Sequence, residues 1–509
     1  NRSMIYVLTL LLFALCLGFI FLYSLIQLSL VIAYKSQTRK SNFQKQDKLP
    51  KELPRITVQL PIYNELYVIE RLLKSISELN YPKDKLEIQV LDDSTDDTSE
   101  IAANIIDDLK LAAFDVKHIR RDNRVGYKAG ALAHGTELAN GEFIAIFDAD
   151  FLPSKNFLLE TIPKFNDDKI GVVQTRWGYT NENYSLLTKM QAFGLNAHFT
   201  VEQTGRNLNN HFINFNGTAG VWRKTCIVDA GGWEADTLTE DLDLSYRAQL
   251  KGWKFIYLEH FESPSELPIE INALKAQQFR WNKGAASCVK KNLAKVWKSK
   301  ELKFSTKLHA TFHLMNSTIF LAILLMTLLT IPVIVIKPMF PEYKYLFQLS
   351  GILALSWFIL AIFYFTSYIG SKNKSENAFN FLWKFPVFLA ISMGLALHNA
   401  IAVFEGYIGK KTPFIRTPKF NVEQNGGWTK NVYNVRKMNP VTFFEGGMVL
   451  YSVLALTQAV AYNDFGIMPL TLFLLFGYAY VFLSSIFHWN KTQKVPIFKV
   501  PAKKLVNHE

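Results

Sequence analysis

Long apolar runs alternate along the chain with one stretch in which charged and apolar residues are mixed. The mixed stretch covers residues 40–305 and is typical of a soluble globular domain. Five nearly uncharged runs approach the roughly 20 residues that a helix needs to cross a bilayer. They occupy residues 5–34, 311–336, 346–370, 441–462 and 465–488. The pattern predicts a globular domain inserted between membrane-spanning helices.

Basic residues gather beside these runs in a chain whose net charge is +13. The clusters lie at residues 35–51, 283–307, 372–374, 410–419 and 491–504. The positive-inside rule places such clusters on the cytoplasmic side of a membrane. It puts the amino terminus outside, with the globular domain and the carboxyl tail in the cytoplasm. Membrane topology thus explains the charge, and we predict no nucleic-acid partner.

A sixth apolar segment, residues 379–407, conflicts with this rule. A crossing there would carry the basic loop 410–419 to the outside. The segment also contains Trp383-Lys384, His398-Asn399 and Glu405, which favour a helix lying in the cytoplasmic interface. We therefore predict five spans and one interfacial helix.

The predicted order of segments follows from these assignments. A transmembrane helix precedes the globular domain, and interface helices, a transmembrane hairpin, an interface helix with a loop, a second hairpin and a cytoplasmic tail follow it. The boundaries are 1–40, 41–270, 271–308, 309–371, 372–440, 441–490 and 491–509.

The globular part alternates strand-like and helix-like patterns. Apolar runs that predict buried strands lie at 56–60, 86–91 and 143–147, and helical periodicity lies between them at 65–79, 97–110 and 127–139. This order predicts an α/β, Rossmann-like domain, in which a parallel sheet is covered by helices on both faces.

Polar residues follow each predicted strand. The three segments are Pro61-Ile-Tyr-Asn-Glu65, Asp92-Asp-Ser-Thr-Asp-Asp97 and Asp148-Ala-Asp150. Ligands of such sheets bind beyond the carboxyl ends of the strands, so we expect a cleft where these segments converge. The sequence has no P-loop and no GxGxxG motif, which leaves metal-bridged carboxylates as the way to hold a nucleotide.

Three motifs could carry chemistry, and each also has a structural explanation. Asp148 and Asp150 could bind Mg²⁺ or Mn²⁺ against a diphosphate, although ordinary acidic turns share this DxD pattern. In Thr239-Glu-Asp241, one carboxylate could be a general base. Alternatively, Thr239 caps a helix and the two acids stabilise the positive end of its dipole.

The third motif is Gln277-x-x-Arg280-Trp281, whose spacing places the three side chains on one helix face. An interfacial Trp beside a snorkelling Arg would produce the same pattern. In the functional interpretation, Arg280 neutralises a leaving diphosphate and Trp281 offers a flat apolar surface to a sugar ring.

Together these motifs have the order and rough spacing of the four motifs D, DxD, TED and QxxRW that are found in one family of enzymes. The chain thus resembles the family 2 processive glycosyltransferases of the cellulose-synthase superfamily. Four longer segments are similar to the plant cellulose-synthase-like (gluco)mannan and glucan synthases. They are Gln89–Asp96, Phe199–Gln203, Phe215–Arg223 and Leu250–Leu258.

The resemblance implies a GT-A catalytic domain joined to an α-helical transmembrane bundle, and a single displacement with inversion. It implies that Glu65, Asp92 and Asp93 hold the nucleoside and that Tyr63 lies in the same pocket. It further implies that Lys128 contacts the diphosphate, that Asp148 and Asp150 bind phosphate and metal, and that Asp241 is the base beside Glu240. Two groups are implied to position the acceptor: the segment Asn216, Gly217 and Thr218, and the residues Gln277, Arg280 and Trp281 at the acceptor mouth. Phe414–Lys419 stands where the family has a gating loop.

The expected activity is polymerisation of a β-linked glucan or mannan from a nucleotide-sugar, with passage of the growing polysaccharide across the membrane. The resemblance favours UDP-glucose somewhat over GDP-mannose as donor. It implies membrane lipids and a secretion protein as partners, in a plasma (inner) or Golgi membrane. Two alternatives stay open, transfer of one sugar to a lipid and nucleotide-sugar sensing without turnover.

Overall fold

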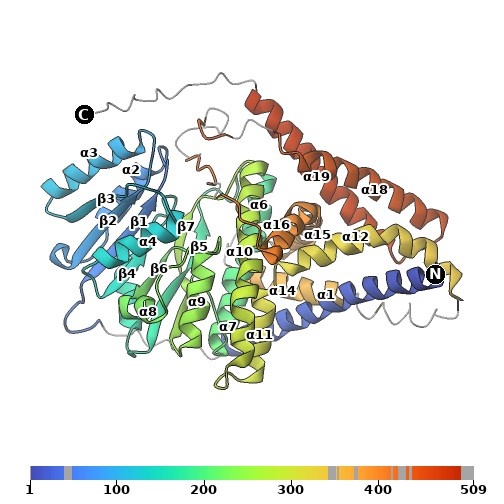
Figure 1. Ribbon diagram of the computed structural model, residues 1–509, viewed down its shortest axis with the longest axis horizontal. Helices are drawn as coiled ribbons and strands as arrows, with labels where there is room; N and C mark the ends of the chain where they lie inside the picture. The colour runs from blue at the N-terminus through green and yellow to red at the C-terminus, as the bar shows by residue number, and fades with distance from the viewer. Residues whose placement is uncertain are drawn as a thin grey trace.

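The computed structural model describes residues 2–38, 49–341, 351, 355–371, 377–413, 416–421, 431–434 and 438–493. Figure 1 shows an α/β unit at one end of the molecule, from which long helices extend toward the other end. The amino terminus lies at the far end of these helices, and α1 (Arg2–Thr38) runs back from it to the α/β unit.

Seven strands form one sheet in the order β3-β2-β1-β4-β6-β5-β7. Their bounds are Ile56–Ile62 (β1), Leu86–Asp92 (β2), Asp115–Arg120 (β3), Phe143–Ile146 (β4), Ile170–Tyr179 (β5), Gly220–Arg223 (β6) and Lys254–Ser265 (β7). The three strands predicted from apolar runs are β1, β2 and β4, and they are confirmed.

The sheet is mixed, so the expectation of a wholly parallel sheet is wrong in one half. β1 pairs in parallel with β2 and β4, but β6 runs antiparallel to both β4 and β5. The four-residue strand β6 follows the helices after β5. Because it runs antiparallel to β5, this connection is not the βαβ crossover that joins parallel strands. The first four strands keep the parallel arrangement that gathers polar carboxyl ends at one edge.

Helices cover both faces of the sheet. Those of the α/β unit are α2 (Ile69–Ser77), α3 (Thr98–Leu111), α4 (Tyr127–Leu138), α5 (Phe157–Thr161), α6 (Leu186–Ala197), α7 (Gln203–Leu208), α8 (Lys224–Asp229) and α9 (Glu240–Leu250), with a π-helical turn at His198–Glu202. Alternate residues of β4 feed two cores, because side chains of a strand alternate between faces. Phe143 and Ala145 join the core under α2 and α3, whereas Ile144 and Ile146 join the core under α4, α8 and α9.

Two helices link the α/β unit to the long helices. α10 (Ile271–Lys298) packs against α9 and α16, and α11 (Phe304–Leu314) packs against α10. The remaining helices are α12 (Thr318–Ile336), α14 (Leu355–Gly370), α15 (Phe381–Gly394), α16 (Ala396–Ile408), α18 (Val441–Ala461) and α19 (Met468–Gln493).

Four helices are long and apolar enough to cross a membrane. They cover Met4–Ser36, Thr318–Met339, Val441–Ala461 and Met468–Gln493, in agreement with four of the five predicted spans. The fifth falls on α14, a shorter apolar helix of 16 residues, and part of that prediction lies outside the described residues. The protein is therefore membrane-associated by the length and composition of its helices.

The segment predicted to be interfacial forms a bent pair of helices. Ala378–Gly394 and Ala396–Ile408 meet at an angle of 51°. α15 packs against α19, and α16 packs against both α10 and α12. Such a bend is compatible with a broken span or with a segment that does not cross, so the interfacial helix stays a prediction.

A labelling experiment tests this topology. In the variant Lys411→Cys we expect modification only by reagents that reach the cytoplasmic side, because five spans leave the exposed residue 411 there. Background should be low, since Cys16, Cys226 and Cys288 are buried. The matched variant Tyr462→Cys, in the turn between α18 and α19, should react only from outside; labelling of both sites from the same side would contradict the prediction.

Candidate active site

A cleft opens where the carboxyl ends of β1 and β4 meet the start of α9 and one face of α10. It gathers thirteen of the fifteen residues that the sequence predicted. They are Tyr63, Glu65, Asp93, Lys128, Asp148, Asp150, Asn216, Gly217, Glu240, Asp241, Gln277, Arg280 and Trp281. Residues 416–419 line the same cleft, so segments more than 350 residues apart in the chain converge on one site.

Asp92 and Thr218 lie below the cleft and do not line it. The Asp92 carboxylate accepts a hydrogen bond from the Ser94 amide at 2.8 Å and contacts Ser99 and His118. The Thr218 hydroxyl accepts a hydrogen bond from the Asp148 amide at 2.9 Å. Both residues therefore shape the cleft from beneath, because their polar groups are already used within the protein.

Lys128 lies at the centre of the acidic groups. It comes from the first turn of α4, and its Nζ donates to Asp148 Oδ1 at 2.6 Å and to the Gly217 carbonyl at 2.8 Å. Burial alone would lower the pKa of this ammonium, but Asp148, Glu240 and Asp241 outweigh burial and raise the pKa above its usual value. Lys128 is therefore held as a cation among the carboxylates.

Asp241 and Glu240 open α9 and face the same space. Burial raises the pKa of Asp241, and the neighbouring Glu240 carboxylate raises it further. Burial also raises the pKa of Glu240, although Lys128 opposes the shift. The pKa of a carboxylate raised in this way moves toward neutral pH, where it can accept a proton from a hydroxyl group.

Gly217 allows the backbone to approach these groups closely. Its φ is 79°, in the region that favours glycine, and a Cβ there would lie 3.0 Å from Asp241 Oδ2. The predicted cap at Thr239 is correct in position, but the Thr239 side chain makes no capping hydrogen bond. Its hydroxyl instead lies 3.5 Å from Cys288 Sγ on α10.

Two arginines that contact Asp93 and Tyr63 in the cleft were not predicted from the sequence. Arg121 donates to both Asp93 oxygens, with Nε at 3.0 Å, and the Arg124 guanidinium lies 3.3 Å from the centroid of the Tyr63 ring. They follow β3, an edge strand in which Lys117 and His118 interrupt the apolar pattern. The basic cluster after this strand is the signal that could have identified them.

Residues 416–419 also reach into the cleft, while the first part of the expected gating loop, Phe414 and Ile415, lies outside the described residues. Arg416 binds the Glu65 carboxylate with Nε at 2.9 Å, and Lys419 Nζ lies 2.6 Å from Asp150 Oδ2. Arg280 donates to the Thr417 hydroxyl at 2.8 Å. The loop thus places cations on two of the acids predicted to serve donor and metal.

Aromatic rings form the opposite wall of the cleft. The Trp281 and Trp177 ring centroids are 6.4 Å apart, and Trp177 stacks on Phe199 at 4.9 Å. Both tryptophans also line a second cavity of about 470 Å³, together with Asp241. Side chains of α1, α12, α14 and α15 complete that cavity, so the acidic cleft and the cavity between the apolar helices are neighbours that share Trp177, Asp241 and Trp281.

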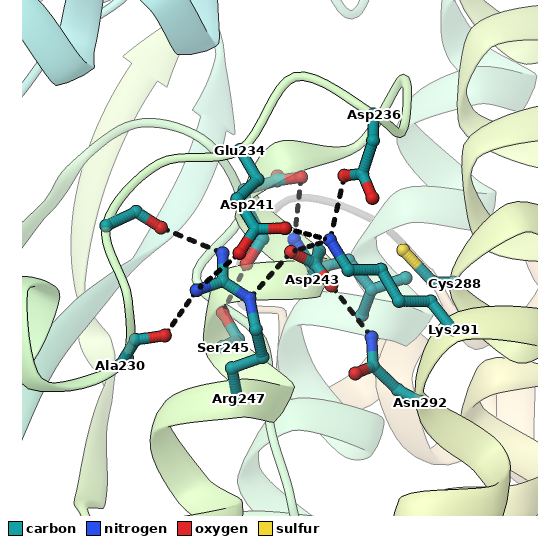
Figure 2. A network of polar contacts seen from close by, with 12 residues as sticks. Ala230, Glu234, Asp236, Asp241, Asp243, Ser245, Arg247, Cys288, Lys291 and Asn292 are labelled. Carbon is teal, nitrogen blue, oxygen red and sulfur yellow. Dashed lines mark hydrogen bonds and ion pairs between the residues drawn. The ribbon is translucent and has the colours of Figure 1, made fainter.

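A polar network holds the start of α9 in place (Figure 2). Lys291 Nζ on α10 donates to Glu234, Asp236 and Asp243 at 2.5, 2.8 and 3.0 Å. Arg247 Nε donates to the same Asp243 oxygen at 2.8 Å. Asp243 lies two residues after Asp241 and is fully buried, so these bonds tie the proposed base to α10.

The three carboxylates of this network lie close enough to suggest a cation site. Lys291 already occupies the space among them, and Asn292 Nδ2 donates to the second Asp243 oxygen at 2.9 Å. Burial alone would raise the pKa of Asp243, but Asn292, Arg247 and Lys291 outweigh it and lower the pKa. The network is therefore an internal ion-pair cluster that positions α9.

Apart from residues 416–419, the side chains that line the cleft fall within a stretch that is similar to a known family. Residues 54–284 match the family described as glycosyltransferase like family 2. This stretch holds all fifteen predicted site residues and the whole seven-stranded sheet. Residues 54–284, with their mixed sheet, are therefore similar to the family 2 glycosyltransferases.

Individual relatives are similar over the same region. A protein of Oryza sativa subsp. japonica named probable glucomannan 4-beta-mannosyltransferase 4 is 43% identical over 264 residues, which cover 51% of this chain and 48% of that protein. Glucomannan 4-beta-mannosyltransferase 2 of Arabidopsis thaliana is 40% identical over 264 residues, 51% of this chain and 49% of that protein. The similarity thus spans about half the length of each relative.

Solved structures show weaker likeness. A mannosyltransferase of Pyrobaculum calidifontis in complex with GDP-Man and Mn²⁺ has 19% identity and a TM-score of 0.49, covering 73% of this chain and 99% of that chain. TarS of S. aureus has 14% identity and a TM-score of 0.37, covering 62% of this chain and 55% of that chain.

The raised pKa of Asp241 leads to a prediction with two measurements. We expect Asp241→Asn to slow sugar transfer by about 10²–10⁴-fold, because the proton acceptor is lost, while donor binding persists. The variant should also unfold at a higher temperature at neutral pH. The pKa of Asp241 is higher in the folded protein than in the unfolded chain, so the ionised carboxylate lowers the free energy of unfolding. This destabilisation decreases as the pH is lowered through the pKa of Asp241 in the folded protein. Substantial residual transfer would contradict the assignment of Asp241 as base.

The network around Lys291 leads to a second prediction. Lys291→Met should lower kcat by roughly 10–100-fold, because α9 and its carboxylates shift, while the donor KM stays within about twofold. Lys291→Arg should restore part of kcat. The exposed neighbour Lys290→Met is the control and should behave as wild type. Equal loss of kcat and donor affinity without rescue by Arg would indicate general unfolding instead.

Proposed function

We propose that the protein is a processive, inverting glycosyltransferase that extends a β-linked glycan and passes it into the membrane-embedded part of the molecule. One observation carries the proposal. Asp241 and Trp281 line both the acidic cleft and the second cavity between the apolar helices. A sugar added at the base would therefore already lie at the entrance of a path toward the membrane.

The proposed step is a single displacement. The Asp241 carboxylate takes the proton of the acceptor hydroxyl, and that oxygen forms a bond with the anomeric carbon of the donor. The bond from this carbon to the diphosphate breaks on the opposite face, so the configuration inverts. Lys128 and Arg280 lie where their charges can stabilise the leaving diphosphate.

A divalent metal fits the acids at the end of β4. Asp148 and Asp150 offer hard oxygen ligands of the kind that Mg²⁺ and Mn²⁺ prefer, and Lys419 already places a cation on Asp150. When bound, the metal would neutralise charge on the diphosphate. Binding of metal and donor requires Lys419 and Arg416 to release Asp150 and Glu65, so residues 416–419 would move with each donor.

The donor is proposed from the relatives. Both relatives named above are called glucomannan 4-beta-mannosyltransferases, so we place GDP-mannose ahead of UDP-glucose, the reverse of the order drawn from sequence. The product would be a β-linked mannan or glucomannan. Tyr63, Glu65 and Asp93 lie at the nucleoside end, where they can distinguish the two nucleobases.

Transfer of one sugar to a lipid is the second candidate, because many aliphatic side chains line the cavity beyond the cleft, among them Leu17, Ile20, Ile319 and Ile323. The aromatic wall of Trp177 and Trp281 favours the polymerase, since flat rings suit stacking against successive sugars. For the location we propose a Golgi or plasma membrane, with the globular domain in the cytoplasm, where nucleotide-sugars are made available.

Purified full-length protein should be offered labelled GDP-mannose, UDP-glucose and a UDP-N-acetylhexosamine in parallel. We expect a β-linked polymer from GDP-mannose that linkage-specific mannanases digest. EDTA should stop the reaction, and Mg²⁺ or Mn²⁺ should restore it. A lipid carrying a single sugar would support the alternative. Polymer from the N-acetylhexosamine donor alone, or full activity in EDTA, would contradict the proposed donor or the metal.

A further inference from the structure

The turn between α10 and α11 carries lysines that the structure separates from the rest of the basic cluster at residues 283–307. Lys283 and Lys291 of that cluster form ion pairs inside the protein, with Glu405 and with the acids of Figure 2 respectively. Four other lysines are exposed and form no ion pair among the described residues: Lys295, Lys298, Lys300 and Lys303. We call residues 295–307 the α10–α11 corner. Its cations are therefore available to a partner outside the chain.

Two aromatic side chains are held at the surface of the α10–α11 corner. Trp297 is 43% exposed and Phe304 is 68% exposed, and their ring centroids lie 6.1 Å apart. The Trp297 Nε1 donates to the Thr311 hydroxyl at 3.0 Å, and the Lys307 Nζ donates to the Trp297 carbonyl at 3.1 Å. An exposed tryptophan beside lysines is typical of a membrane interface. The two bonds hold the exposed rings in a defined position next to the lysines.

Helix α11 has an apolar face on the side that the rest of the protein leaves open. Phe304, Leu308 and Phe312 follow one another at helical spacing, and none of them is buried. The opposite side of the helix is buried and consists of Thr306, His309, Ala310, His313 and Leu314. Phe312 stacks on Phe19 of α1, with ring centroids 6.2 Å apart. The apolar face of α11 therefore continues into a helix that is long and apolar enough to cross a membrane.

The contact with α1 places α11 at the boundary of the apolar helices. Phe19 lies within the apolar segment Met4–Ser36. About two turns further along α1, Gln27 is 1% exposed, and its Nε2 donates to Glu202 of the α/β unit at 2.5 Å. Helix α1 thus passes from the apolar helices into the α/β unit close to where α11 meets it. Figure 1 shows α10 and α11 running across the direction of α1 at this level, as helices do that lie along a membrane surface.

We propose that the α10–α11 corner binds the anionic lipid headgroups of the membrane leaflet nearest to the α/β unit. Five lysines stand against a single acid, Glu301, between residues 295 and 307, so the charge of the corner complements an anionic surface. The lysines contact headgroup phosphates, while Trp297 and Phe304 enter the layer beneath them. The exposed rings favour a lipid surface over a soluble polyanion, because a lipid surface also removes their apolar area from water. The inference does not rest on the proposed sugar transfer.

The test uses the full-length protein with Ser305→Cys, labelled with an NBD fluorophore, in nanodiscs of equal parts phosphatidylglycerol and phosphatidylcholine. Ser305 is exposed beside Phe304, and Cys16, Cys226 and Cys288 are buried, so labelling should be specific. A nitroxide is placed on the acyl chains of one lipid or of the other, and it quenches the fluorophore only at close range. We expect phosphatidylglycerol to quench roughly twofold more than phosphatidylcholine, because the lysines gather anionic lipid around the corner. High salt should reduce this difference.

Charge variants of the labelled protein complete the test. In Lys298→Gln/Lys300→Gln/Lys303→Gln the two lipids should quench equally, whereas Lys298→Arg/Lys300→Arg/Lys303→Arg keeps the charges and should keep the difference. The control Lys74→Gln/Lys110→Gln/Lys155→Gln removes three exposed lysines of the α/β unit and should behave as the parent protein. Three results would overturn the proposal: equal quenching by both lipids in the parent protein, quenching by neither, or a difference that survives the glutamine changes. None of these readouts depends on sugar transfer, so the proposed activity is tested separately.

Discussion

The ammonium group of Lys128 makes the interactions on which the cleft of the α/β unit depends. Glu240, Asp241 and Asp148 cannot gather at one point without a cation, because buried like charges repel strongly. Lys128 supplies that cation from α4 and also binds the Gly217 carbonyl, so the segment before β6 is drawn to the same point. A buried charge that is paired and hydrogen-bonded therefore joins the end of β4, the start of α9 and the loop before β6.

Helix α10 supports this point from two sides. One face of the helix brings Gln277, Arg280 and Trp281 to the cleft, while Lys291 and Asn292, three turns further on, hold Asp243. The same helix packs on α16 among the apolar helices. Through this helix and the network of Figure 2, the start of α9 is connected to the apolar helices.

Charge is distributed differently along the path from the cleft to the membrane. In the acidic part of the cleft, carboxylates are paired with Arg121, Lys128, Arg416 and Lys419. This pairing suits the nucleotide and the metal that we propose to bind there. Beyond Asp241, aromatic and aliphatic side chains take over. This change suits the proposed reaction, in which a charged diphosphate and a neutral glycan would leave in different directions.

Local pattern determined much of this protein in advance. The apolar runs identified β1, β2 and β4 and four long apolar helices, because burial in a sheet or a membrane demands continuous apolar sequence. Motif order identified thirteen of the residues in the cleft. The edge strand β3 and the short strand β6 were not predicted. Lys117 and His118 in β3 are polar and only partly buried, and the four residues of β6 are too few to show a pattern. Only the tertiary structure decided the antiparallel course of β6 and the burial of Asp92. It also decided that Arg416 and Lys419 contact acids about 270 to 350 residues away in the chain. The position of Asp241 in the lining of two cavities likewise depends on the tertiary structure. Such contacts depend on how distant segments pack, and no local sequence pattern encodes them.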